Sequence, residues 1–412
     1  MPINVKMAWR NIWRNPRRTL LTVAAIAFAS LLLVFMISFQ FGSYETMINT
    51  SVKIQAGHLQ VQAQGYRDKK EIRLVVPDPL AIARILDKIP AVQAYTTRAT
   101  AFALVSSRDR TYGTLVVGID PQKEAQVSTL AKLIRTGRYL EPDDVDQALI
   151  GKLLAQNLHV GIGDELTVLG QGRDGSIAAA IVRISGIYSS GLDEFDRSAI
   201  HLPLATFQDV FAMRGAVHEV VAIGRSLGDV AAIKTAVLKQ LDATGHAERL
   251  TALDWQELMP GLVEAIKLDM ISGLIFYGIL VLVVAFSILN TFLMAIFERT
   301  REFGVMMAIG TAPGRLTKLL LIESISMTAI GILAGMLSGS VVTYYFQIHG
   351  LEFEGSAEML SQFGITGSMY PKLTWLSLLI GPGLVMAITS LAALYPALKI
   401  RRLKPVEALT HA

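Results

Sequence analysis

Four long apolar runs dominate the pattern of hydrophobic and polar positions along the chain. The windows without a charged side chain are Thr19–Tyr44, Ile271–Phe297, Ser324–Gln347 and Leu373–Leu398. A helix needs roughly 20 residues to cross a hydrocarbon core of about 30 Å, so each window is long enough to span a membrane. With flanking residues included, we predict transmembrane helices over residues 19–44, 270–297, 319–347 and 373–398.

The first apolar run has a second interpretation. A basic leader followed by "LLTVAAIAFAS" resembles a secretory signal sequence with an A-x-A-like cleavage site. However, the run continues through "LLLVFMISFQF", beyond the length of a signal's apolar region. We therefore predict an uncleaved membrane anchor.

The segment before the first span has helical periodicity. Its apolar positions are Val5, Trp9, Ile12 and Trp13, and its basic positions are Lys6, Arg10, Arg14 and Arg17. Two such faces predict an amphipathic helix over residues 1–18 that lies on membrane lipid in the headgroup region. Basic residues interleaved with tryptophan also occur in nucleic-acid-binding segments. Because a span follows at once, we predict no nucleic-acid partner.

Residues 45–269 alternate between strand and helix patterns. "GHLQVQAQ", "ATAFALVSS" and "TYGTLVVGID" predict strands, whereas "PLAIARILDKI" and "DVAAIKTAVLKQL" predict helices. "ALIGKLLAQNLHVGIGDELTVLG" predicts a helix, a turn and a strand, and "QGRDGS" predicts a hairpin turn. The fold class predicted is a membrane protein with four transmembrane helices, an N-terminal interfacial helix, and a large mixed α/β extracytoplasmic domain inserted between the first and second spans.

An amphipathic stripe connects this domain to the second span. Trp255, Leu258, Leu262 and Ile266 share one face of the helix predicted for "WQELMPGLVEAIKLDM", and Pro260 should bend that helix. The stripe fits a stalk that moves with the domain, and it fits ordinary domain packing equally well.

Charge sets the predicted orientation. The sequence is 52% hydrophobic and 17% charged and has no cysteine, which indicates a membrane protein whose outer domain has no disulfide. Lysine and arginine concentrate in segment 1–18, in loop 298–318 and in tail 399–412, whereas loop 348–372 has Glu352, Glu354 and Glu358 against Lys372. Because cytoplasmic loops carry the basic excess, both termini and loop 298–318 are predicted to be cytoplasmic.

Catalytic and metal-binding patterns are weak. The chain has no G-x-x-x-x-G-K-[ST] phosphate loop, and "HEVVA" at His218 lacks the second histidine of a zinc site. "GRSLG" around Ser226 matches a nucleophile elbow. Asp242 and His246 follow it, yet only about 40 residues separate the serine from the membrane, too few for a hydrolase fold. We predict neither catalysis, nor a metal, nor a cofactor in this chain.

The third span has a face of small residues. Gly331, Gly335 and Gly339 recur every four residues, which lets another helix approach closely. That helix belongs either to the same chain or to a dimer partner. Glu323 near the start of this span should reach the interface or an arginine of the preceding loop. One acid does not make a proton relay, which disfavours a proton-driven transporter.

Several stretches together resemble the FtsX/MacB/LolC-LolE superfamily of ABC transporter permeases. They are "AWRNIWRNPRRTLLT", "HVGIGDEL", "GIYSSGLDEFDRSAIHLP", "ERTREFGVMMAIGTAPGRLTKLLLIES" and "YPALKIRRLKPVEAL". The resemblance implies a bacterial inner-membrane permease of the mechanotransmission type, with residues 45–269 as a periplasmic MacB-like core domain.

The resemblance also implies that loop 298–318 is a coupling helix that docks in a cytoplasmic ABC ATPase. The residues expected to contact the ATPase are Glu298, Arg299, Arg301, Glu302, Val305, Met306 and Ile309, and Gly310 should end the helix. ATP and magnesium would bind to a separate ATPase dimer, and the permease would pair with itself or with a related chain.

Family membership leaves the cargo open. The expected activity is release or export of a lipoprotein or another lipophilic substrate. The hairpin "GQGRDGS" is short for the protruding hook that recruits a lipoprotein carrier in LolC-like subunits. Alternatives are export of a drug or peptide through a periplasmic adaptor, and FtsX-like signalling to a cell-wall hydrolase, although the FtsX-like outer domains are usually smaller.

Overall fold

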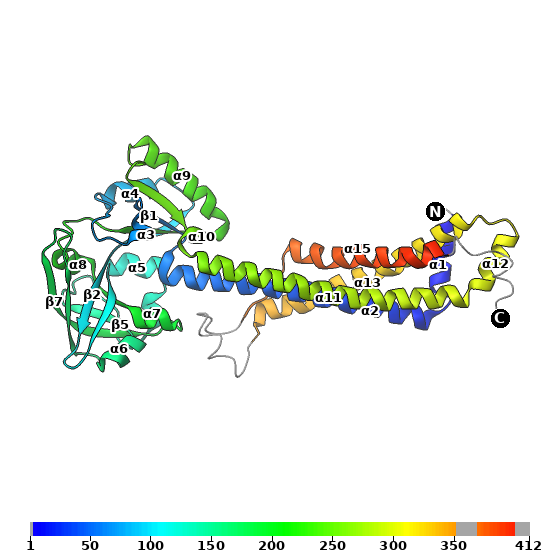
Figure 1. Cartoon of the computed structure of the whole chain (residues 1–412), viewed down its shortest axis with the longest axis horizontal. Helices are drawn as coiled ribbons and strands as arrows, with labels where there is room; N and C mark the ends of the chain where they lie inside the picture. Colours follow the sequence, from blue (N-terminus) through cyan, green and yellow to red (C-terminus); the bar gives the residue numbers. More distant parts are fainter. Residues whose placement is uncertain (1–2, 352–368, 400–412) are drawn as a thin grey trace. The chain divides into compact units, whose positions relative to one another are not determined.

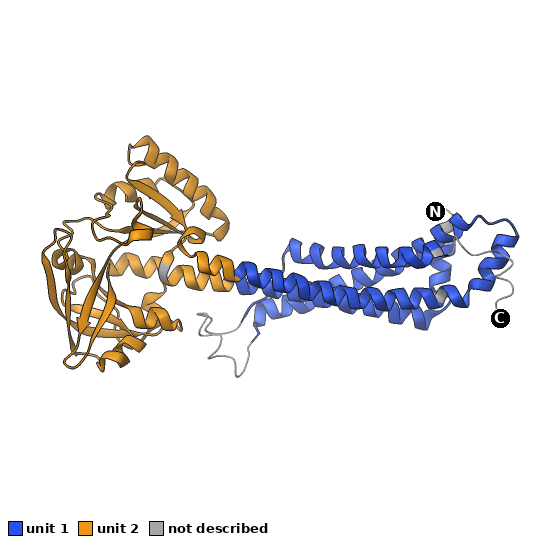
Figure 2. Cartoon of the chain, viewed as in Figure 1, with its two compact units in different colours: residues 1–45, 266–352, 368–412 blue, residues 46–265, 353–367 orange. Residues whose placement is uncertain are grey.

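The computed structural model describes residues 3–351 and 369–399. The chain divides into two compact units (Figure 2). We call residues 1–45, 266–352 and 368–412 the helical unit, and residues 46–265 and 353–367 the α/β unit. Each unit is described separately below. Parts of loop 348–372, including its three glutamates, and nearly all of tail 399–412 lie outside the described residues.

Four helices in the described part of the chain are long and apolar enough to cross a membrane. They are α2 (Pro16–Ser51), α11 (Pro260–Glu298), α13 (Pro313–His349) and α15 (Trp375–Lys399). Their mutual core in the helical unit includes Ile26, Ile288, Met327 and Val385. The predicted fold class, four spans with a mixed α/β domain between the first and second, is confirmed.

The N-terminal helix is shorter than the predicted range 1–18. Helix α1 covers Ile3–Ile12, and α2 begins at Pro16. Proline is favoured at the first position of a helix because its missing N–H has no partner there, which explains the break. Ile12 is buried in the core of the helical unit, while Trp9 and Trp13 stay exposed. The tryptophans therefore do not share the buried face with Ile12.

The described residues of the α/β unit contain one ten-stranded sheet (Figure 1). Strands β2, β3, β8, β5, β7 and β6 pair in sequence, and β6 pairs back to β2, so these six strands close a ring. Strands β9, β1 and β10 extend the sheet from β2, and β4 pairs with β7. The strands are β1 (Leu59–Ala63), β2 (Val92–Ser106), β3 (Thr111–Ile119), β4 (Ile134–Gly137), β5 (Gln147–Gly151), β6 (Glu165–Gln171), β7 (Ile177–Tyr188), β8 (Ala199–Pro203), β9 (Glu219–Gly224) and β10 (Leu250–Asp254).

Short helices cover this sheet. They are α3 (Tyr66–Lys69), α4 (Pro79–Leu86), α5 (Pro121–Val127), α6 (Lys152–Leu158), α7 (Asp193–Ser198), α8 (Leu204–Val210), α9 (Val230–Ala243) and α10 (Trp255–Leu258). One core fills the strand ring, with Val105, Val168 and Ile200 among its members. A second core lies where α4 and α9 pack on β1, β9 and β10.

Sequence pattern found most of these elements but missed some strands. Residues 148–151, predicted as the start of a helix, belong to β5, because these positions are buried between β7 and β8. Strands β4 and β10 carried too short a pattern to be assigned. The hairpin turn in "QGRDGS" is confirmed: Gly172 N donates to Ser176 O at 2.8 Å between β6 and β7.

The predicted stripe before the second span is interrupted instead of bent. Helix α10 ends at Leu258, and α11 starts at Pro260. Trp255 and Leu262 pack in one cluster with Val52, and Leu258 and Ile266 are half-buried. This arrangement is domain packing, and movement of the stripe as a stalk stays a prediction.

Candidate functional site: helix α12 and its ion pairs

Helix α12 (Thr300–Ala308) fills the segment between α11 and α13. The chain leaves helical geometry at Arg299, where φ is −106°, and Thr300 Oγ1 donates to Ile296 O at 2.9 Å across the break. At the other end Gly310 has a φ of +98°, which favours glycine. Gly310 N donates to Met307 O, and Thr311 N donates to Met306 O at 2.9 Å. This bond pair is the Schellman motif that terminates helices.

One face of α12 is packed against the spans. Phe303 is fully buried in a cluster with Ile296, Leu316 and Leu320, and Met306 is half-buried against the same cluster. Met306 therefore packs partly inside the chain, and its contact with the ATPase stays a prediction.

The opposite face of α12 is exposed and partly apolar. Arg301, Val305 and Ile309 follow one another at intervals of four residues and therefore share a face. Ile309 is 78% exposed and Val305 46% exposed. Apolar side chains of this size in water are what a partner protein covers in a helix-in-groove contact.

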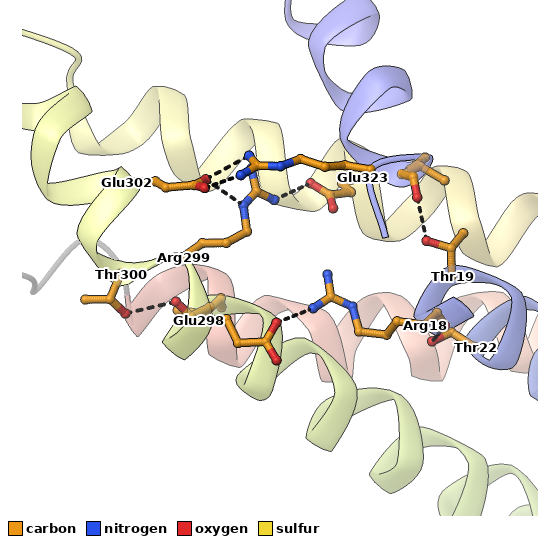
Figure 3. A network of polar contacts seen from close by, with 11 residues as sticks. Arg18, Thr19, Thr22, Glu298, Arg299, Thr300, Glu302 and Glu323 are labelled. Atoms are coloured by element: carbon orange, nitrogen blue, oxygen red, sulfur yellow. Dashed lines mark hydrogen bonds and ion pairs between the residues drawn. The ribbon is translucent and has the colours of Figure 1, made fainter. Parts of the chain in front are cut away.

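Ion pairs connect α12 to the start of the chain (Figure 3). Arg14 makes a two-pronged contact with Glu302, from Nη1 to Oε2 at 3.1 Å and from Nη2 to Oε1 at 2.5 Å. Arg18 Nη1 lies 2.9 Å from Glu298 Oε2. The Arg14 hydrogen bond lowers the pKa of Glu302 below its ordinary value, and the same contact raises the pKa of Arg14. Both groups therefore stay charged at neutral pH.

Arg299 joins the two acids nearest to it. Its Nε lies 3.3 Å from Glu302 Oε2, and its Nη1 lies 3.4 Å from Glu323 Oε2. The prediction that Glu323 reaches an arginine of the preceding loop is confirmed. Glu323 is buried on α13, so Arg299 also supplies the counter-charge that a buried carboxylate requires.

Three of the predicted ATPase contacts have partners within the chain, and their contact with the ATPase stays a prediction. Glu298, Arg299 and Glu302 were expected to face the ATPase, yet all three pair within the chain. Their partners Arg14 and Arg18 were assigned to the membrane interface. The sequence signal for this pairing was an acid-free basic segment and a loop that contains two glutamates, but Arg14 and Glu302 lie 288 positions apart.

The glycines of α13 face α2. A Cβ at Gly331 would lie 2.7 Å from the Ile26 Cβ, and one at Gly335 would collide with the Ala27 carbonyl oxygen. A Cβ at Gly339 would lie 3.1 Å from the Leu31 Cα. Of the two interpretations left open by the sequence, the structure has the contact within one chain.

The weaker motifs have structural roles. Ser226 accepts the capping hydrogen bond of the 3₁₀ turn Leu227–Asp229, and its Oγ donates to Asp229 Oδ2 at 2.9 Å. His218 is buried, with Nδ1 accepting from Thr100 N at 2.9 Å and its ring stacked on Tyr66. The described residues contain no group of three metal-ligating side chains.

Comparison with known proteins identifies the family. The model of the FtsX-like permease C-terminal domain matches residues 274–405, and that of the MacB-like periplasmic core domain matches residues 19–240, more than half of the chain. The chain belongs to the FtsX/MacB family of ABC transporter permeases.

The names of individual relatives of this permease indicate different substrates. The lipoprotein-releasing system transmembrane protein LolC of Xylella fastidiosa is 23% identical over 374 residues, which cover 86% of this chain and 85% of that protein. The macrolide export ATP-binding/permease protein MacB of Sodalis glossinidius is 24% identical over 435 residues, covering 99% of this chain and 60% of that protein. Among solved structures, the periplasmic region of MacB from Actinobacillus actinomycetemcomitans has a TM-score of 0.38 at 13% identity and covers 52% of this chain and 94% of that one.

Proposed function

We propose that this permease transmits the motion of a cytoplasmic ABC ATPase to its α/β unit on the far side of a bacterial inner membrane, and thereby releases or exports a lipoprotein or another lipophilic substrate. The single observation that carries this proposal is the exposed face of α12, formed by Arg301, Val305 and Ile309. We call these three residues the docking face.

The helix that presents the docking face is held in place by packing and by ion pairs. Phe303 anchors α12 in the apolar cluster formed with Leu316 and Leu320, and Arg299 and Glu302 add ion pairs to two other segments. A force on α12 would therefore reach α11, α13 and the N-terminal segment together. This is the mechanical property that a coupling element needs, because a loosely attached loop would absorb the motion.

The charge pattern supports the orientation. Segment 1–18 and residues 298–318 carry the basic excess that marks cytoplasmic loops, and α12 belongs to the second of these. The α/β unit would then lie on the opposite side. ATP and magnesium would bind to the partner ATPase dimer, with this chain supplying no cofactor site. The ATPase dimer would engage two permease chains, either two copies or one copy with a related chain.

The spans support a lipophilic cargo. The central windows of all four spans contain no charged side chain, and the buried Glu323 is neutralised by Arg299. A hydrophilic solute would need polar groups along its path. We therefore favour a substrate that leaves from the bilayer itself, such as a lipoprotein.

The proposal includes no carrier protein at the β6–β7 turn. Arg173 in this turn donates from its backbone N to Phe211 O at 2.9 Å and from its Nη1 to Met213 O at 3.1 Å. The turn is thus hydrogen-bonded to the residues that follow α8. Export of a macrolide-like compound through an adaptor is the second candidate, favoured by the alignment of MacB over 99% of this chain.

Charged substitutions test whether the docking face binds the ATPase. Val305→Glu combined with Ile309→Glu places two carboxylates where an apolar contact is proposed, and we expect at least a tenfold loss of co-purifying ATPase from native membranes in mild detergent. The matched control is Leu80→Glu combined with Leu238→Glu, two exposed leucines on α4 and α9 of the α/β unit. The control should retain the ATPase.

The same purification separates the candidate functions. A small ATPase together with a lipoprotein supports release, and an ATPase together with a periplasmic adaptor supports export. An ATPase with a cell-wall hydrolase would support signalling. If the docking-face variant keeps its ATPase, α12 is not the coupling helix, and if the unchanged chain purifies without any ATPase the transporter proposal fails.

A further inference from the structure

Strands β2, β6 and β7 present apolar side chains on both of their faces. Their inward positions, such as Val105 and Val168, lie in the core of the strand ring. Their outward positions include five large apolar side chains that are 46–82% exposed: Phe102, Leu104, Leu169, Ile177 and Ile181. We call these five the outer apolar face. Strands β2 and β7 are labelled in Figure 1.

The register places these five side chains on adjoining strands. Leu104 of β2 is opposite Leu169 of β6, and Leu169 is opposite Ala179 of β7. Ile177 and Ile181 lie two positions to either side of Ala179 and so point to the same side of the sheet. The outer apolar face is therefore one continuous surface across three strands.

Its extent is unusual for a surface in contact with water. With ordinary side-chain areas, five residues exposed to this degree present on the order of 600 Å², at the upper end of the largest patch found on most soluble monomers. An antiparallel sheet with one wet face normally alternates polar and apolar residues. In the stretches "FALV" and "IAAAIV", both the inward-facing and the outward-facing positions are apolar. This pattern is typical of a sheet that is covered on both sides.

The charges beside this surface indicate what covers it. Glu165 of β6 and Arg183 of β7 pair at 3.0 Å across the same two strands, and both are exposed. An acid next to a base is complementary to a copy of itself related by a two-fold axis. A strongly charged partner or an anionic lipid surface would instead call for one sign of charge around the apolar residues.

We propose that the outer apolar face packs against the same face of a second copy of this chain. This inference rests on the proposed function in one respect, since that function brings two permease chains side by side. The available area of about 600 Å² is about three-quarters of the roughly 800 Å² per partner that stable interfaces bury. Two chains held in one complex also pay little of the entropy of association, so a face of this size is sufficient.

The lack of cysteine in this chain makes the test clean. Leu104→Cys, Leu169→Cys and Ala179→Cys place single thiols along the central row of the face. The matched control is Leu80→Cys, an exposed leucine on α4. Each full-length variant is treated in its native membrane with a short bis-maleimide. We expect a covalent species of twice 44.8 kDa for the three face variants, at least tenfold above the control.

A second variant tests the contact without a cross-linker. Leu169→Glu combined with Ile181→Glu puts carboxylates on the face and should lower cross-linking through Ala179→Cys at least tenfold. The co-purifying ATPase should be unchanged, because these residues lie in the α/β unit.

The outcomes separate this inference from the proposed function. Cross-linking to a protein other than this chain, or no face-specific product while the ATPase still co-purifies, would overturn the self-contact and leave the transporter proposal intact. Absence of the ATPase from the unchanged chain would overturn the proposed function. The cross-link would then still report whether two copies meet at this face.

Discussion

The contact between α13 and α2 depends on Gly335, and Gly335→Ala tests it with a single added methyl group. Its Cβ would collide with the Ala27 carbonyl oxygen and would lie 2.6 Å from the Ser30 Cβ. Carbon atoms in ordinary contact are 3.5–4.0 Å apart. The two helices must therefore move apart by about 1 Å at this point, since a backbone carbonyl has no rotamer to adopt.

Two effects of opposite sign decide how much Gly335→Ala changes the free energy of unfolding. Alanine favours a helix over glycine by about 1 kcal/mol. Overpacking of a close contact costs about 1–3 kcal/mol. Because the obstacle at Gly335 is backbone, we expect the upper part of that range and a net loss of about 1–2 kcal/mol. Where the added methyl group meets nothing, only the favourable effect remains.

Gly278 and Gly383 supply that comparison. A Cβ at either position meets no atom within 4 Å, and both glycines lie inside apolar helices, α11 and α15. The unfolding midpoints of all three alanine variants are measured by titration with a denaturing detergent, followed by tryptophan fluorescence. Gly335→Ala should be about 2–3 kcal/mol less stable than both controls. If it equals or exceeds the stability of both controls, the close contact between α2 and α13 is absent.

Three further predictions concern pH, capping and the ion pairs. Burial lowers the pKa of His201 to about 4, against about 6.5 in an unfolded chain, so the unfolded state binds more protons in this window. The contribution of His201 to stability should fall by about 2 kcal/mol from pH 7 to pH 5, and His201→Gln should reduce the total pH slope in thermal unfolding scans by that amount; an unchanged slope would contradict the buried histidine. Ser226→Ala should cost about 1 kcal/mol of stability, because the cap on Asp229 is lost, and it should leave transport unchanged. If the variant instead loses an ester-hydrolysing activity, Ser226 is a nucleophile. Arg14→Glu should reduce ATPase co-purification, and adding Glu302→Arg should restore it; failure of the swap would show that the pair does not position α12.

The elements with long or specific local signals were predictable from sequence. The four spans required only their apolar length, since no other structure of 20 apolar residues satisfies its backbone in lipid. Gly310 was predicted to end α12 because a left-handed residue after a helix is usually glycine. Strand β5 was not predictable in this way, because its short apolar run fits a helix equally well and only its neighbours β7 and β8 decide.

The sequence by itself determined the membrane class of this permease, the order of its domains and the segment that contains the candidate coupling helix, because apolar length, basic excess and glycine position act locally along the chain. Only the tertiary structure decided which side of α12 is available. Met306 and Ile309 are equally apolar, yet the first packs beside Phe303 and the second stays exposed. The same holds for Glu302, whose partner Arg14 lies 288 positions away. Which of these side chains is buried or paired depends on which distant segments come into contact, and the local sequence does not determine that.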